Sequence, residues 1–216
     1  MPTRTKKTAA ELPLRSLTPP VWASQVLHDP IALLSDHAHL EKKAAANALD
    51  LIHRYPQTRS HDDDAYRDRW VKTLSVIARE ESEHLALVIR LLHERGGQLS
   101  KHHRNQYAAD LRQHVRLGAG SRDTIDRLMV SALIEVRSCE RFGVLADNCD
   151  DPALAKLYSG LYASELGHYH IFIELARGLP GATEVESRWN EWLDIEANVI
   201  GAQAPTSSMH SGVKMG

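Results

Sequence analysis

The chain has 216 residues, a formal net charge of −2 and 25% charged residues, values typical of ordinary globular proteins. It is long enough to bury a substantial apolar core, and we expect a single domain over residues 1–216. No apolar run approaches the roughly 20 residues of a membrane-spanning helix, and the N-terminus lacks the apolar stretch of a secretory signal. The two cysteines, Cys139 and Cys149, form no Cys-x-x-Cys pair. We therefore expect a cytoplasmic protein without a disulfide framework.

Helical periodicity runs through the sequence, and strand-like alternation is absent. Residues 1–17 have the character of a loosely ordered arm, and Pro19-Pro20 opens a short helix. The pair Asp29-Pro30 is a strong start signal for the first long helix, because aspartate caps the first turn and proline fits the first helical position. The apolar stripe of this helix is interrupted by one acid, Glu41.

Five further helices are predicted after it. Their approximate ranges are 65–94, 100–118, 122–147, 152–177 and 183–200. Asp151-Pro152 repeats the earlier start signal, and glycines follow several of the predicted ends. The tail from 201 to 216 is expected to be loosely held. The pattern predicts an all-α protein in which four long helices form a bundle, with additional short helices.

Two short motifs carry the strongest chemical signal. Glu81-Ser82-Glu83-His84 and Glu165-Leu166-Gly167-His168 each place a carboxylate and an imidazole three residues apart, on one face of a helix. Each motif follows, one long helix later, a lone Glu within an apolar stripe. One Glu from each of two helices and a Glu-x-x-His from each of two others form the ligand set of a carboxylate-bridged dinuclear metal site in a four-helix bundle.

Four carboxylates that face a bundle interior are costly unless they are paired or coordinated. Two divalent ions would balance them, with the Glu of each motif bridging, the His as a terminal ligand and the lone Glu completing each metal. Mixed carboxylate and imidazole ligation suits iron or manganese. The alternative is that these are surface acids on amphipathic helices. The predicted ligands are Glu41, Glu81, His84, Glu135, Glu165 and His168.

Glu140, five residues after Glu135, is an alternative ligand. Glu135 is preferred because the apolar residues before it mirror those before Glu41. Cys139, one turn after Glu135, is predicted to be a small core residue, and the alternative is that it lines a substrate channel.

Several polar residues accompany the predicted ligand helices. His37, His39 and His170 are interpreted as residues that support the ligands from behind or lie at the surface, rather than as ligands. Asp36 is a candidate to orient a ligating imidazole, since such rings usually donate their second N–H to a carboxylate or a carbonyl.

Residues 101–127 carry six Lys or Arg against three Asp, a local charge of +3 in a chain that is negative overall. A solvated helix face is the commoner explanation of such a run, and contact with nucleic-acid phosphates is the alternative. The candidates for phosphate contact are Lys101, Arg104, Arg112, Arg116, Arg122 and Arg127.

Four segments resemble those of the bacterial tRNA 2-methylthio-N6-isopentenyladenosine hydroxylases. They are Asp36-His-Ala-His-Leu-Glu41-Lys-Lys-Ala-Ala, Arg79-Glu-Glu-Ser-Glu-His84-Leu, Ile134-Glu-Val-Arg-Ser-Cys-Glu-Arg-Phe142 and Glu165-Leu-Gly-His-Tyr-His170. The resemblance spans residues 17–200 and has no departure at the six predicted ligand positions. The Ser-Cys-Glu-Arg-Phe and Leu-Gly-His-Tyr-His stretches are far more specific than the ligand pattern, which ferritins and rubrerythrins share.

The resemblance implies a ferritin-like bundle with two iron ions. It implies a non-haem di-iron monooxygenase that uses O2 and two external electrons to hydroxylate the isopentenyl group of the modified adenosine next to the tRNA anticodon. The chain has neither the cysteine set of an iron–sulfur protein nor a dinucleotide fingerprint, so that a separate ferredoxin- or flavodoxin-type reductase system is expected. A monomer or small oligomer is expected. The alternatives are a ferritin-like or rubrerythrin-like peroxidase or ferroxidase, and a metal-storage bundle without turnover.

Overall fold

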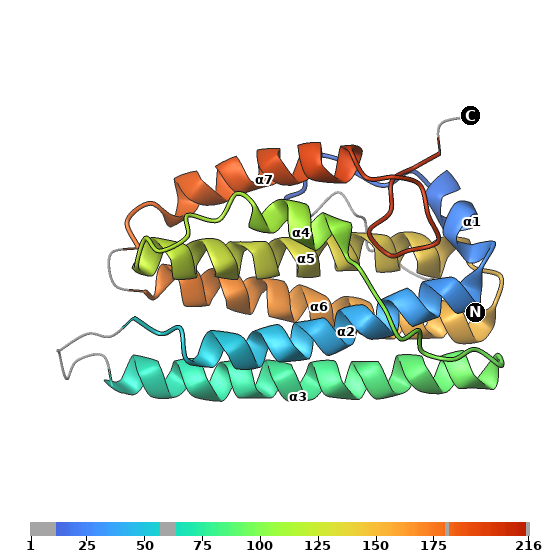
Figure 1. Cartoon of the computed structure of the whole chain (residues 1–216), viewed down its shortest axis with the longest axis horizontal. Helices are drawn as coiled ribbons and strands as arrows, with labels where there is room; N and C mark the ends of the chain where they lie inside the picture. Colours follow the sequence, from blue (N-terminus) through green and yellow to red (C-terminus); the bar gives the residue numbers. More distant parts are fainter. Residues whose placement is uncertain (1–11, 57–63, 180–181, 215–216) are drawn as a thin grey trace, which may run out of the picture.

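The computed structural model describes residues 12–56, 64–179 and 182–214, and this part of the chain is helical with no strand (Figure 1). The expected all-α, ferritin-like bundle is confirmed. The long helices are α2 (Pro30–Ile52), α3 (Asp64–Glu94), α5 (Ser121–Asn148) and α6 (Pro152–Arg177), and the shorter ones are α1 (Val21–Leu27), α4 (Gln106–Arg112) and α7 (Val185–Gly201). No helix in the described ranges is long and apolar enough to cross a membrane.

The two Asp-Pro signals begin helices as predicted. The Asp29 side chain accepts a hydrogen bond from the backbone N–H of Ala32, and Asp151 caps α6 in the same way. The helix predicted over 100–118 is shorter than expected, since α4 covers only seven residues. The residues before it are held by side chains of α2 instead: His39 bonds Ser100, and Asp36 bonds His103 at 2.7 Å.

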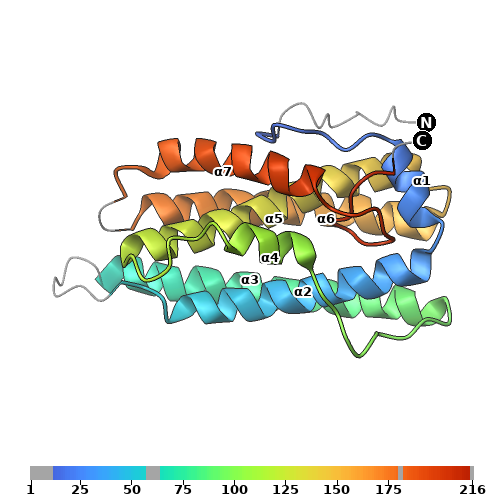
Figure 2. The ribbon, with the colours of Figure 1, turned by 45° about the horizontal axis from the view of Figure 1, so that its top comes forward.

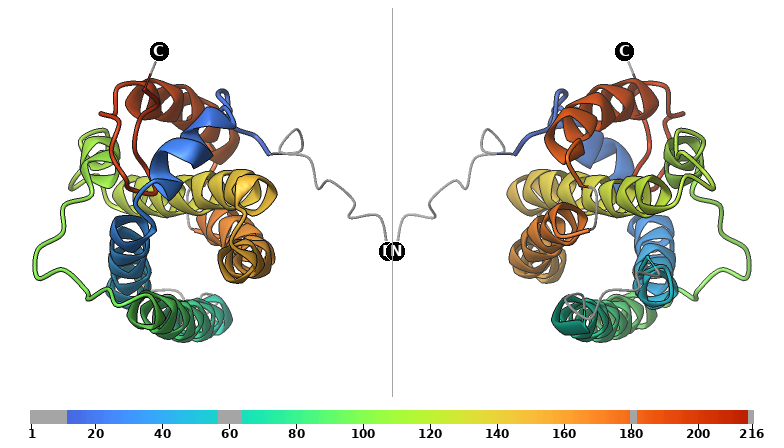
Figure 3. Two further views of the ribbon diagram at one scale, coloured as in Figure 1. Left: turned by 90° about the vertical axis from the view of Figure 1, so that its right-hand side faces the viewer. Right: turned by 90° about the vertical axis from the view of Figure 1, so that its left-hand side faces the viewer.

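The long helices form two antiparallel pairs, α2 with α3 and α5 with α6 (Figure 1). Seen from the end of the bundle, α4 and α7 lie over α5 as an additional layer (Figure 3). Helix α1 packs against α2 and α5 at one end of the molecule (Figure 2).

The apolar core is divided into two clusters by a polar layer. On α2, Leu34 and Ala38 belong to one cluster and Ala48 and Leu51 to the other, with Glu41 between them. In α3, α5 and α6 the predicted ligands likewise lie between the segments that enter the two clusters, and the antiparallel helices α3 and α5 meet the clusters in the reverse order. Each long helix therefore presents its acid at the same level of the bundle.

The two ends of the chain are packed more tightly than we expected. In the described part of the N-terminal arm, Leu14 is buried, and in the C-terminal tail Met209 is fully buried. Residues 1–11 and 215–216 lie outside the described part. In the tail, which we expected to be loosely held, residues 209–212 are buried, whereas residues 201–206 are mostly exposed. The physical reason is Arg141 of α5, a buried guanidinium that donates hydrogen bonds to the backbone carbonyls of Met209 and Ser211 and lies 4.5 Å from the centre of the Trp22 ring.

Replacing Arg141 tests this account of the tail. In Arg141→Ala the two buried carbonyls lose their donor, and each costs about 1–3 kcal/mol when it is left unsatisfied. We expect the free energy of unfolding to fall by at least about 2 kcal/mol in urea denaturation of the metal-free protein. Arg79→Ala is the control, because Arg79 is exposed and its ion pairs are with Glu80 and Glu83 of its own helix, and it should change the stability of the metal-free protein by less than about 0.5 kcal/mol. Equal effects of the two changes would contradict the tail's dependence on Arg141.

Candidate metal centre

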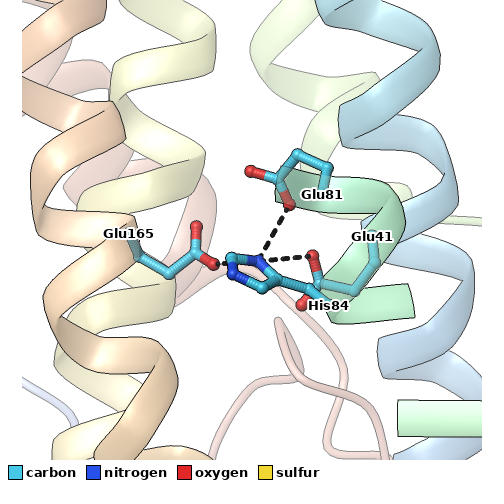
Figure 4. A group of neighbouring side chains, drawn as sticks. All are labelled: Glu41, Glu81, His84 and Glu165. Carbon is cyan, nitrogen blue, oxygen red and sulfur yellow. Dashed lines mark ion pairs between the residues drawn. The ribbon is translucent and has the colours of Figure 1, made fainter. Parts of the chain in front are cut away.

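The structure brings all six predicted ligand residues together in the middle of the bundle. They form two overlapping groups in which the ligand atoms lie within 4.8 Å of one another. The groups share Glu81 and Glu165, the arrangement expected of bridging carboxylates. Figure 4 shows how one group is assembled, with the His84 ring between three carboxylates from α2, α3 and α6. The groups are Glu41, Glu81, His84 and Glu165, and Glu81, Glu135, Glu165 and His168.

The ligand side chains lie close to one another but do not form hydrogen bonds with one another. The Nδ1 atom of His84 lies 3.2 Å from Glu165 Oε1 and 3.4 Å from Glu81 Oε2, and Nδ1 of His168 lies 2.7 Å from Glu81 Oε1. None of these contacts has hydrogen-bond geometry, so that both Nδ1 atoms and both Glu81 oxygens are buried without a hydrogen-bond partner. Such orphaned buried groups are rare in native structures. Lone pairs that converge on a common point are what metal ligands require, and the residues fit a metal site.

The electrostatics of the centre point the same way. Burial and the neighbouring carboxylates of Glu81 and Glu165 raise the pKa of Glu41 and of Glu135 well above the usual range. Burial lowers the pKa of His84, but the carboxylates of Glu165 and Glu81 outweigh it and raise this pKa to about 9. The same balance raises the pKa of His168 to about 11. In the absence of a bound metal ion, these side chains therefore bind protons, which offset the negative charge of the centre.

Two further side chains position the ligands from outside the cluster. The Nε2 atom of His168 lies 2.9 Å from Glu80 Oε2, which leaves Nδ1 free to face the cluster. His37 is buried, and its Nε2 lies 2.6 Å from Glu41 Oε1. The interpretation of His37 as a supporting residue agrees with this contact. The sequence does not single out Glu80, because no histidine follows it three residues later, and the contact with His168 joins two helices that are far apart in the chain.

The alternative ligand Glu140 lies outside the cluster. Its carboxylate accepts hydrogen bonds from the backbone N–H and the hydroxyl of Thr18, at 2.6 and 2.7 Å, and pairs with Arg137 at 3.0 Å. Cys139 is buried and its Sγ lies 3.2 Å from the carbonyl oxygen of Tyr162, as expected of a core residue.

The remaining candidates near the ligands have other roles. His39 bonds Ser100, and His170 is exposed. The suggestion that Asp36 orients a ligating imidazole is wrong: its carboxylate accepts from His103 and from the backbone N–H of Met209. Asp36 thus ties the segment before α4 and the C-terminal tail to α2.

The six basic candidates for phosphate contact divide into two sets. The Arg116 side chain donates two hydrogen bonds to buried Asp126 and pairs with Glu184. Glu184 also pairs with Arg122. Arg127 pairs with Asp123. The remaining three are exposed and form no ion pair within the described residues; they are Lys101, Arg104 and Arg112.

A helical bundle with a cluster of carboxylates and imidazoles at its centre defines the class of ferritin-like metalloproteins. Comparisons with known proteins narrow this class. The model of the family described as tRNA-(MS[2]IO[6]A)-hydroxylase (MiaE) matches residues 7–211, and the chain belongs to this family.

Two curated relatives carry the name tRNA 2-(methylsulfanyl)-N(6)-isopentenyladenosine(37) hydroxylase. The protein from Pseudomonas putida is 34% identical over 91% of this chain and 90% of its own length, and that from Salmonella typhimurium is 27% identical over 91% and 86%. Among solved structures, a Synechococcus protein described as having aldehyde deformylating oxygenase activity is similar, with a TM-score of 0.80, 32% identity, and coverage of 92% of this chain and 96% of that one.

The contact of Glu80 with His168 makes a specific prediction. Supporting carboxylates of this kind typically contribute 10- to 100-fold to metal affinity, so that Glu80→Ala should weaken Co(II) binding by about that factor. Glu83→Ala is the matched control, because Glu83 is exposed on the same helix. Like Glu80 it accepts a hydrogen bond from Arg79, but it does not contact His168. The affinities are measured by titrating the visible absorption of bound Co(II). Equal affinity of the two variants would refute the positioning role.

The raised pKa values predict the pH dependence of metal uptake. A metal binds neutral imidazole and ionised carboxylate, and below their pKa values of about 9 and about 11 the two histidines carry protons in the metal-free centre. Apparent Co(II) affinity should therefore rise as the pH is raised towards 9, with release of protons. Titrations at several pH values with an indicator dye measure both quantities. An affinity that does not change with pH would contradict these protonation states.

Proposed function

We propose that this protein is a di-iron monooxygenase that hydroxylates the isopentenyl group of 2-methylthio-N6-isopentenyladenosine in tRNA, next to the anticodon. The observation that carries the proposal is membership of the hydroxylase family over residues 7–211, in a chain that places the complete predicted ligand set in two overlapping groups. Two curated relatives bear the name of this reaction.

The proposed cofactor is a pair of iron ions. Glu41 and His84 would serve one ion, Glu135 and His168 the other, and Glu81 with Glu165 would lie between them, in agreement with the shared members of the two groups. Two iron ions held in this way supply the activation of O2, with two electrons from outside, for insertion of one oxygen atom into a C–H bond.

The chain's own residues hold and shield this centre. Glu80 and His37 each contact one ligand, His168 and Glu41 respectively, and the two apolar clusters flank the ligand layer. A cysteine-bound iron–sulfur cluster needs four thiolates, and the chain has two cysteines. The electrons are therefore proposed to come from a separate ferredoxin- or flavodoxin-type system. We further propose a cytoplasmic location, because the proposed substrate is tRNA, and a monomer or small oligomer.

Two other reactions compete with this proposal. A peroxidase or ferroxidase would act on peroxide or Fe(II) without any nucleic acid. An aldehyde substrate is suggested by the description of the similar Synechococcus structure. Neither reaction gives a role to the exposed cations near α4.

The decisive experiment supplies the iron-loaded, chemically reduced protein with 18O-labelled O2 and tRNA that carries 2-methylthio-N6-isopentenyladenosine. Nucleosides are then analysed by mass spectrometry, and we expect one labelled oxygen on the modified adenosine. Consumption of peroxide, Fe(II) or a long-chain aldehyde, with no labelled nucleoside, would replace the proposal by the corresponding alternative.

Two variants link this reaction to the centre. Glu81→Ala removes a member of both groups, and His168→Ala a member of one. We expect both to lose bound iron and to abolish hydroxylation, whereas Glu140→Gln, outside the cluster, should keep its iron. Full hydroxylation by either ligand variant would show that the assignment of ligands is wrong.

A further inference from the structure

A cavity beside α4 has one predicted metal ligand in its wall. It has a volume of about 70 Å3 and is enclosed by residues of α2, α4 and α5 and by Asn105. Glu135 is the predicted ligand that this wall contains, so that the cavity borders the metal cluster from the side of α2 and α5.

The wall of this cavity suits an aliphatic group. Leu40, Val130 and Ile134 are the larger apolar residues of the wall, and Ala44 and Ala108 leave room between them. A space of this size exceeds the volume that one water molecule needs several-fold. It is of the order of a short branched hydrocarbon chain rather than of a base or a sugar.

The rim of the cavity is cationic. Lys43 of α2 and Arg112 of α4 both belong to it and are exposed. The ammonium of Lys43 lies 2.9 Å from His103 Nδ1, and the other nitrogen of that ring lies 2.7 Å from Asp36. This chain of contacts holds Lys43 at the rim and ties the segment before α4 in place.

The two rim cations form no ion pair in the part of the chain that the structure describes, and both belong to the wall of one cavity. Burial and the charge of Arg112 lower the pKa of Lys43, and the carboxylate of Asp36 opposes this shift. Two like charges held together in this way favour an anion between or beside them. The cations farther along the sequence, by contrast, are paired: Arg116 with Asp126 and Arg127 with Asp123.

We propose that this cavity is the port through which the isopentenyl chain of the modified adenosine reaches Glu135 and the centre, and that Lys43 and Arg112 bind the phosphates that flank this nucleotide. The inference rests on the proposed tRNA hydroxylation and adds the location and the recognising residues. The modified nucleotide must leave the base stack of the anticodon loop for its side chain to enter, as is usual for enzymes that act on a base.

An apolar groove on α3 is the competing entrance. Leu85, Ala86 and Ile89 line it, but none of the six ligand residues does. No two unpaired cations flank it either, since Arg90 is the only lysine or arginine in its described wall. The groove nevertheless provides a sharp control for the test.

The first test measures binding of an anticodon stem-loop RNA to the metal-loaded protein. In the double variant Lys43→Gln/Arg112→Gln we expect affinity to fall at least tenfold and the slope of log K against log salt to decrease by about 1.4, or about 0.7 for each phosphate contact. The double variant Lys72→Gln/Lys156→Gln removes the same charge from exposed positions on α3 and α6 and should bind within twofold of the wild type. Equal losses in the two double variants would overturn the phosphate contacts.

The second test fills the port. The stem-loop is used with and without the isopentenyl group, and the wild type should prefer the prenylated form. We expect Ala44→Leu to keep its iron and its affinity for the unprenylated RNA but to lose the preference, and kcat/KM for hydroxylation to fall at least tenfold. Ala46→Leu, exposed on the same helix, should behave as the wild type.

The outcomes separate this inference from the function on which it rests. If Ala44→Leu keeps both the preference for prenylated RNA and the hydroxylation activity, the port is overturned and the hydroxylase reaction stands. The same conclusion follows if Ala86→Leu, in the groove on α3, loses the preference and the activity instead. A wild-type protein that neither prefers the prenylated RNA nor hydroxylates it would refute the proposed function, and the port would fall with it.

Discussion

The structure depends on one constraint: four carboxylates are buried at the same level of a narrow helical bundle. Each of Glu41, Glu81, Glu135 and Glu165 is at most 5% exposed, and isolated buried charges of one sign are strongly unfavourable. Two imidazoles come within reach, but they do not form hydrogen bonds with the carboxylates. Bound cations remove the conflict, because they neutralise the acids and use the converging lone pairs. The helix pairing, the two apolar clusters and the contacts of Glu80 and His37 all keep these side chains in one layer.

Much of this arrangement could be predicted from the sequence because its signals are local. The Asp-Pro pairs begin α2 and α6, and the spacing of Glu81 and His84 places both on one face of a helix, whatever the rest of the chain does. The preference for Glu135 over Glu140 followed from the apolar residues that precede each lone acid. Such patterns indicate which face of a helix is buried. In a bundle, the buried face is the one that packs against the other helices.

The features that were missed depend on contacts between distant segments. Arg116 appeared to be a free cation, but it lies in the connection before α5 and pairs with Asp126, which is buried on that helix. The tail was expected to be loose because no pattern in residues 201–216 reveals that Arg141 needs its carbonyl oxygens. Lys43 was not among the basic candidates, since it lies outside the stretch 101–127 and approaches it only in the folded protein. Charge counted along the chain therefore does not separate the three arginines that pair with acids, Arg116, Arg122 and Arg127, from the basic residues that form no ion pair within the described residues.

The division of the apolar core has a consequence for how the protein folds. The same four helices build both clusters, but the polar layer interrupts apolar contact between them at every helix. In the metal-free chain this division favours separate cooperative units with different protection against hydrogen exchange. Cations bound by residues of all four helices would join these units, and loading would convert a molecule with two folding units into one that opens as a whole.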